Sequence, residues 1–323
     1  MKDTQRGVAL LIVLWVTTIL AVTALSFSVL TRAETYGTLN FKDRLEKKYL
    51  AEAGVERGIA EMINYSLNVN KTVTMEGKEV WKTDGTAYEG RLDKGSYVVC
   101  LYDESGKISL NGLTDASGII VKNLLVNLGS PPEEADTIVD SILDWKDADD
   151  LHRLKGAESE YYQSLPHPYK ARNADFESLE ELLLVKGVTP DILYGRETRK
   201  GLIQFFTLYN MTNLINLKAA PREIMTALPG VDAAAADRIV DLRNAGMLKS
   251  LQEVTAMIGG ANSLAMPYIT IQAGMAGGIT AYTITTTGYK DNDKRGYSIT
   301  ATVALGGPGR YSYLYYRSPS DDL

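Results

Sequence analysis

Residues 8–30 read VALLIVLWVTTILAVTALSFSVL, and this run decides how the rest of the chain is organised. It contains no charged residue, no proline and no glycine. As a helix rising ~1.5 Å per residue it would be roughly 35 Å long, enough to cross a hydrocarbon core of ~30 Å. We therefore expect a membrane-spanning helix at 8–30, with the short basic flank of Lys2 and Arg6 keeping the N-terminus cytoplasmic. The chain after Leu30 would then lie outside the inner membrane.

The helical pattern continues beyond this run. Over 31–66, apolar residues such as Leu45, Val55 and Ile59 recur at helical spacing, and charged residues fill the other face. This predicts an amphipathic helix continuous with the membrane span. A cleaved signal peptide, for which Ala21–Ala24 offers a small-residue site, is the alternative, but it has no reason to continue into the first mature helix. Gly54 and Gly58 predict close approach of another backbone or tight packing of a sheet on this helix.

Strand patterns occupy the two flanks of a helical block. The strands are expected at 71–75, 78–81, 87–92, 96–102, 107–110, 279–289, 297–304 and 311–316, with a hairpin turn at Glu76-Gly77. Helix starts recur in between, at Pro132, Ser178, Pro221 and Ala233. The sequence therefore predicts an α+β fold, in which the long N-terminal helix packs on an antiparallel sheet from 67–111 and 278–323, with a large inserted all-α domain at 112–277.

Composition limits the classes of function. The 323 residues are 45% hydrophobic, enough for two folded units. The formal charge of -6 leaves no global basic field for nucleic acid. Cys100 is the only cysteine, so an intrachain disulfide is impossible. Nineteen tyrosines against five phenylalanines indicate half-exposed sheet faces and interfaces.

An acidic loop offers a candidate metal site. Asp147 and Asp149 are two residues apart in a loop, Glu158 could return a third carboxylate, and Asn173 could supply an amide oxygen. Weaker candidates are Asp144, Asp150 and Glu160. Oxygen donors of this kind suit Ca²⁺, although the spacing is not that of an EF-hand. The alternative is a solvated acidic loop that caps a helix.

Two segments resemble the hairpin of a helix-hairpin-helix module. They are Leu228-Pro229-Gly230-Val231-Asp232 and, more weakly, Val185–Pro190. Such hairpins can hold DNA phosphates on backbone N–H groups. The charges over 211–260 balance to zero, however, so counterion release gives no affinity for DNA and a structural helical bundle is the favoured interpretation.

Catalytic patterns are missing from the sequence. The only histidines, His152 and His167, have no nucleophile or metal-ligand spacing around them. We therefore expect no enzymatic activity.

An ordered set of motifs resembles minor pseudopilin K of the type II secretion system, within the type IV pilin-like superfamily. Arg6-Gly7 before the apolar run looks like a prepilin leader, residues 1–7, cut after Gly7 so that Val8 becomes the first mature residue. The further motifs that carry the resemblance are AEAGVE at 51–56, DESGKISLN at 103–111, DWKDAD at 144–149, GAE at 156–158, Tyr161-Tyr162, SLEEL at 178–182, INLKAAP at 215–221 and LPG at 228–230. Lys218-Ala219 departs from the Asn-Thr usual at that point.

The resemblance implies a role as well as a fold. It implies a pilin fold, cleavage and methylation by a prepilin peptidase, a single-pass inner-membrane protein with a periplasmic C-terminal domain, and calcium in the insertion. The implied partners are minor pseudopilins I and J and, through them, the rest of the pseudopilus. Contacts with secreted cargo or the outer-membrane secretin stay open.

The fifth mature position has a physical interpretation of its own. Ordinary pilins carry Glu there, paired with the terminal amine of the subunit beyond, whereas this chain has Ile12. A tip subunit has no neighbour beyond it, so an apolar residue fits. The resemblance itself implies a place at the pseudopilus tip. On that resemblance we expect a structural subunit that initiates and caps the tip and supports export of folded periplasmic proteins across the outer membrane. The alternatives are a membrane-tethered DNA-binding protein, a type IV pilus-associated protein, or a plain bitopic envelope protein.

Overall fold

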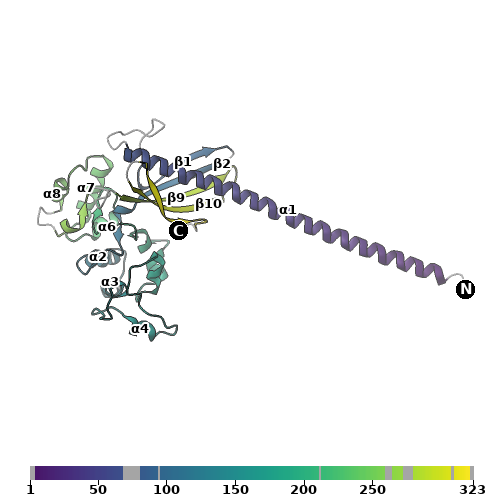
Figure 1. Ribbon diagram of the computed structural model, residues 1–323, viewed down its shortest axis with the longest axis horizontal. Helices are drawn as coiled ribbons and strands as arrows, with labels where there is room; N and C mark the ends of the chain where they lie inside the picture. Colours follow the sequence, from purple (N-terminus) through teal and green to yellow (C-terminus); the bar gives the residue numbers. More distant parts are fainter. Residues whose placement is uncertain are drawn as a thin grey trace.

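The structure is a computed structural model that describes residues 4–67, 81–93, 95–210, 212–258, 264–271, 279–306 and 309–320. Figure 1 shows a folded body from which one long helix projects. Residues 1–3 of the predicted leader and the predicted hairpin around Glu76-Gly77 lie outside the described residues.

The long helix α1, Thr4–Leu67, is 64 residues long and covers both predicted halves without a break. Residues 9–42 are exposed along its projecting part (Figure 1). By length and composition, α1 is the one helix in the described part of the chain that could cross a membrane. Its apolar, unburied first half is what a lipid-embedded segment requires.

The second half of α1 packs on the sheet. Ala51, Val55, Ile59 and Met62, three or four residues apart, are buried on one face. A Cβ built on Gly58 would lie 3.1 Å from Leu101 Cδ2, so the helix approaches the sheet closely. Tight packing of a sheet on this glycine-bearing face is confirmed.

The sheet has five antiparallel strands in the order β1-β2-β9-β10-β11. Their bounds are β1 Asp84–Leu92, β2 Gly95–Asp103, β9 Ile279–Lys290, β10 Tyr297–Gly306 and β11 Tyr311–Arg317. The predicted strands at these five places are confirmed. Because β2 pairs with β9, the two flanks of the helical block join in one sheet.

The predicted strand at 107–110 is wrong as a member of this sheet. After β2, the 3₁₀ helix η1, Glu104–Gly106, turns the chain away, held by the Ser105 N–H, which donates to Asp103 Oδ1 at 2.9 Å. The short strand β3, Ile108–Ser109, then pairs in parallel with β6, Phe206–Thr207. Both edges of β2 are already paired, with β1 and β9, so a third neighbour has no place there.

The region between β2 and β9 has a hydrophobic core of its own, in which α2, α3 and α6 pack together. Its remaining elements are α2 Gly118–Asn127, α3 Pro132–Lys146, α4 Ser159–Gln163, η2 Leu179–Leu184, α5 Pro190–Tyr194, β4 Gly195–Arg196, β5 Arg199–Lys200, η3 Leu202–Gln204, β7 Ile215–Asn216, α6 Arg222–Ala227, α7 Ala233–Asn244, α8 Leu251–Met257, η4 Met266–Tyr268 and β8 Ile269–Thr270. The α+β fold class is confirmed. Three pairs of two-residue strands accompany the helices, and they are too short to leave a period in the sequence.

Candidate metal centre

Three carboxylates converge where α3 ends and α4 begins. Asp144 lies in the last turn of α3, Asp147 follows the helix as its C-cap, and Glu158 precedes the first turn of α4. One oxygen from each lies within 4.8 Å of the others. Asp144 and Glu158 are buried, with exposed fractions of 0% and 4%. Among the described residues, these three form the one group of three or more His, Cys, Asp or Glu side chains that could hold a metal ion.

Several oxygens around this point are buried without a hydrogen-bond donor among the described residues. They are Asp147 Oδ1, both carboxylate oxygens of Glu158, and Asn173 Oδ1. Buried polar atoms nearly always have a partner, and a buried charge left alone is costly. A cation bound by these oxygens would satisfy them.

Asn173 is tied to the same helix end. Its backbone N–H donates to the Trp145 carbonyl at 2.9 Å, and its φ of 48° is left-handed, which asparagine tolerates. Its Nδ2 donates to the Asp149 carbonyl at 3.3 Å and to Asp150 Oδ1 at 3.2 Å. These contacts use the amide nitrogen and leave Oδ1 available as a ligand.

Arg153 provides the positive charge of the cluster. Its Nη1 lies 2.7 Å from Asp144 Oδ1 and 2.6 Å from Asp147 Oδ2, and its Nε donates to Asp115 Oδ1 at 2.7 Å. Its backbone N–H also faces the Asp144 carboxylate, at 3.1 Å from Oδ2. These bonds, led by the one to Asp115, raise the pKa of Arg153 further. With Arg153 included, Asp144, Asp147 and Glu158 keep two uncompensated negative charges when ionised.

Burial makes that excess charge costly. Burial raises the pKa of Glu158 to about 7, with further contributions from Asp144 and Asp147. Burial likewise raises the pKa of Asp144, against the hydrogen bonds from Arg153. An all-oxygen donor set with two excess negative charges fits a divalent hard cation such as Ca²⁺.

Gly156 allows the cluster to close. A Cβ at residue 156 would lie 1.8 Å from Asp144 Oδ2, closer than any side chain can approach. The carboxylate of Asp144 therefore needs glycine at this point in the loop.

The ligand set in the structure differs from the one that the sequence favoured. Asp149 is exposed, and its Oδ1 accepts a hydrogen bond from the Leu151 N–H at 2.8 Å. Asp150 and Glu160 are also exposed. Asp144, a weaker candidate by sequence, belongs to the cluster because it lies one helical turn before Asp147. The sequence analysis did not identify Arg153 as part of the site, because a single basic residue in an acidic loop carries no sign that its side chain pairs with buried carboxylates.

The remaining predicted site residues lie on α1. Gly7 and Val8 fall within its first turns, and Ile12 is 59% exposed on the apolar projecting part. This geometry leaves leader cleavage a prediction.

In the helix-hairpin-helix-like segment, the side chains that could bind or admit a phosphate are engaged in contacts within the protein. Asp232 caps α7, and its Oδ1 accepts from the Ala235 N–H at 2.7 Å. Arg222 Nε lies 2.5 Å from Asp237 Oδ1. Nη1 of the half-buried Arg243 donates to the Ala220 carbonyl oxygen at 2.6 Å. These contacts give the DNA-binding alternative no support.

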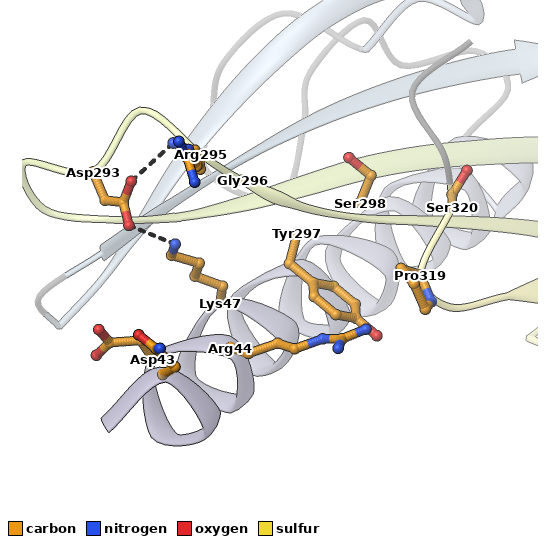
Figure 2. Close-up of a pocket in the computed structure, with 11 residues that line it drawn as sticks. Asp43, Arg44, Lys47, Asp293, Arg295, Gly296, Tyr297, Ser298, Pro319 and Ser320 are labelled. Carbon is orange, nitrogen blue, oxygen red and sulfur yellow. Dashed lines mark hydrogen bonds and ion pairs between the residues drawn. The ribbon is translucent and has the colours of Figure 1, made fainter. Parts of the chain in front are cut away.

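A groove of about 430 Å³ lies where α1 leaves the sheet (Figure 2). Lys47 Nζ is 2.5 Å from Asp293 Oδ2, and the Arg295 backbone N–H donates to Asp293 Oδ1 at 2.9 Å. Arg44 lies over the ring of Tyr297, 5.7 Å from its centroid. The groove carries charges of both signs, and Lys47 and Asp293 pair with each other across it. We therefore interpret it as a packing contact between α1 and the β9–β10 turn.

Comparisons with known proteins agree with this fold. Residues 106–195 match the family model described as "Type II secretion system (T2SS), protein K". A solved structure titled as the GspK-GspI-GspJ complex from the enterotoxigenic Escherichia coli Type 2 Secretion System contains a similar chain. The TM-score is 0.63 at 15% identity, over 89% of this chain and 100% of that chain. At this identity the likeness shows the fold.

Three sequence relatives carry "type II secretion system protein K" in their names. The Escherichia coli K12 relative is 28% identical over 199 residues, 59% of this chain and 61% of that protein. The Pectobacterium carotovorum relative is 27% identical, with 61% and 62% covered, and the Pseudomonas aeruginosa relative is 27% identical, with 79% and 77% covered. This chain thus spans about three fifths of the length of the first two relatives. The chain is thus similar in sequence and in fold to protein K of the type II secretion system.

Proposed function

We propose that this chain is a minor pseudopilin that initiates and caps the tip of the type II secretion pseudopilus. The observation that carries the proposal is the arrangement of its two ends. The apolar half of α1 projects at one end of the molecule, and the inserted helices lie at the opposite end (Figure 1). A subunit built in this way can assemble laterally through α1, while its broad opposite end blocks further stacking.

Ile12 supports the tip position. It occupies the place where an ordinary pilin would need a neighbouring amine for its carboxylate, and no such pair is required at the end of a filament. The chain would be an inner-membrane protein with a periplasmic body, trimmed after Gly7 by a prepilin peptidase. Its role would be structural and not enzymatic.

The partners proposed are proteins I and J of the same secretion system. The structural neighbour is a chain of a crystal structure titled as the GspK-GspI-GspJ complex. We extend that assembly to this chain because the folds agree across the whole of the neighbour's chain.

Calcium is proposed as a structural ion at the cluster of Asp144, Asp147 and Glu158, with Asn173 Oδ1 as a further ligand. The ion would neutralise the excess negative charge and link the C-terminal end of α3 to the start of α4. The buried oxygens without donors are the observation that supports it.

Mass spectrometry of the mature N-terminus tests the processing step. In cells that contain the prepilin peptidase, the chain should begin at Val8, and in cells without the peptidase it should keep residues 1–7. A tagged full-length chain should also co-purify with proteins I and J. An intact leader in both strains, or a chain found repeated along the pseudopilus shaft, would contradict the proposal.

A further inference from the structure

The candidate ion and Arg153 use different oxygens of the acidic cluster. Arg153 Nη1 lies 2.6 Å from Asp147 Oδ2, whereas Asp147 Oδ1 is buried and has no hydrogen-bond donor among the described residues. Glu158 is 4% exposed, and neither of its carboxylate oxygens has a donor there. A cation on the oxygens without donors and the guanidinium on the other oxygens can therefore be bound at the same time. The ion does not have to displace Arg153.

The guanidinium of Arg153 is held in place from its other side. Its Nε and Nη2 donate to the two carboxylate oxygens of Asp115, at 2.7 Å and 3.3 Å. The Arg153 carbonyl accepts from the Gly156 N–H at 3.1 Å, and the Arg153 N–H faces the Asp144 carboxylate. A guanidinium stays protonated across the physiological pH range, and its planar fork suits a two-point contact with a carboxylate. Arg153 is therefore a permanent positive charge at a fixed position beside the cluster.

Arg153 also decides the net charge of the buried cluster. Among the described residues, it is the one basic side chain that pairs with Asp144 or Asp147. Lys146 and Lys186 instead each donate to two backbone carbonyls. Three ionised carboxylates and one guanidinium leave two negative charges in excess, and one divalent cation cancels them. A net charge of either sign would be costly at a buried position.

We propose that Arg153 is the specificity-determining residue of this site: its charge makes the site neutral with one divalent cation and so disfavours a trivalent cation. The inference rests on the proposed calcium ion, and it names the residue that determines which class of cation the site takes. With Arg153 in place, a trivalent ion would leave one positive charge in excess inside the protein. Without Arg153, the three carboxylates would match a trivalent ion instead.

The charge of the site can be separated from its shape by the choice of ions. Ca²⁺ and Tb³⁺ both prefer oxygen ligands and are similar in size, so a change in ligand geometry weakens the binding of both. Coulomb energy scales with the product of the charges, so removing the guanidinium strengthens the attraction for Tb³⁺ more than that for Ca²⁺. The ratio of the two affinities therefore reports the charge of residue 153. A purely structural role of Arg153 would leave this ratio unchanged.

Competition between the two ions in the detergent-solubilised full-length chain tests the proposal. Tb³⁺ luminescence excited through the buried Trp145, which directly follows Asp144, reports the bound ion, and its displacement by Ca²⁺ gives the affinity ratio. Arg153→Gln should raise the preference for Tb³⁺ over Ca²⁺ at least ~10-fold. Arg153→Lys keeps the charge, so its ratio should stay within ~3-fold of the wild type.

Two further variants complete the experiment. Arg222→Gln on α6 removes the same charge from a guanidinium that pairs with Asp237, and it should leave the ratio unchanged. Glu158→Gln removes one negative charge from the cluster, so it should lower the preference for Tb³⁺ at least ~10-fold. Because Glu158→Gln keeps Arg153, it tests the charge balance even if Arg153→Gln fails to fold.

The outcomes distinguish this inference from the proposed function. An unchanged ratio in Arg153→Gln or in Glu158→Gln would overturn the inference, as would an Arg153→Lys variant that behaves like Arg153→Gln. A wild type that still binds Ca²⁺ would then leave the calcium part of the proposed function standing. If the wild type binds neither ion, the calcium ion and this inference fail together. Co-purification with proteins I and J tests the tip role separately.

Discussion

Gly54 of α1 and Thr286 of β9 meet so closely that a Cβ at residue 54 would lie 2.2 Å from Thr286 Oγ1. Thr286 is buried at 1% exposure, and its hydroxyl has no partner among the described residues. Helix and sheet thus share a contact that only glycine permits. This contact sets how deeply the second half of α1 sits on the sheet.

Gly54→Val is expected to lower the free energy of unfolding by ~1–3 kcal/mol, the usual cost of overpacking a filled core. Adding Thr286→Ala should restore part of the loss, because it removes the atom that a side chain at residue 54 meets first. Chemical unfolding of the detergent-solubilised chain measures both. The matched control is Gly37→Val on the same helix, where nothing lies within 4 Å, and it should change the stability by less than ~0.5 kcal/mol. Equal effects at residues 37 and 54 would contradict the packing argument.

Calcium should stabilise the chain through Asp147 and not through Asp149. Asp147 Oδ1 is buried without a donor, whereas Asp149 is exposed and outside the cluster. At a calcium concentration ~100 times Kd, the wild type should gain ~2.7 kcal/mol. Asp147→Asn should lose most of this gain, and Asp149→Asn should keep it. Thermal unfolding with calcium and with chelator measures the difference, and identical melting in the two conditions for the wild type would remove the ion from the proposal.

The candidate metal site also shows which part of the ligand set could not be predicted from the sequence. The loop spacing indicated Asp147 and Asp149 as the first pair, because two alternating carboxylates in a loop can share an ion. The structure instead continues α3 to Lys146, so Asp144 lies one turn below Asp147 on the same face. The choice between Asp144 and Asp149 depends on the residue at which the helix ends, and helix ends are the least predictable part of a sequence pattern.

The strands show the same limit. Long alternating patterns such as 297–304 predicted sheet members correctly, because one face packs on α1. Residues 107–110 were also predicted as a strand, yet β3 pairs with β6 nearly a hundred residues later. Local sequence specifies that a segment is extended, and only the rest of the fold specifies its partner.

Without calcium, stability should fall as pH rises toward neutrality. Burial raises the pKa of Glu158 from 4.5 to about 7, so the folded chain holds a proton that the unfolded chain has already released. This contribution is fully present below about pH 4.5 and is lost as pH rises through about 7. Glu158→Gln, which cannot ionise, should flatten that part of the stability profile in chelator. Unfolding measured between pH 4.5 and 8 checks this, and the same slope in the wild type and in Glu158→Gln would assign the pH dependence to other groups.

Gly156→Ala should disturb the cluster without altering any ligand. The added Cβ would lie 1.8 Å from Asp144 Oδ2, so the carboxylate must move and its bonds with Arg153 must weaken. We expect a loss of ~1–3 kcal/mol, as for other overpacked sites, and a weaker response to calcium. Gly306→Ala, where nothing lies within 4 Å, is the control and should leave both quantities unchanged. If both variants melt like the wild type, the close contact of residue 156 with Asp144 is not needed.

Ile12→Glu tests whether the apolar fifth mature position belongs to a tip subunit. A carboxylate placed in the membrane-spanning part of α1 costs ~2.5–3.5 kcal/mol unless a positive group pairs with it. A chain at the tip has no further subunit to supply an amine, so Ile12→Glu should reduce the recovery of this chain with proteins I and J from membranes. Ile12→Val keeps the position apolar and should leave recovery unchanged. Quantitative co-purification from membranes measures both variants. Undiminished recovery of Ile12→Glu would mean that a neighbour does pair with this position, and the chain would then belong within the filament.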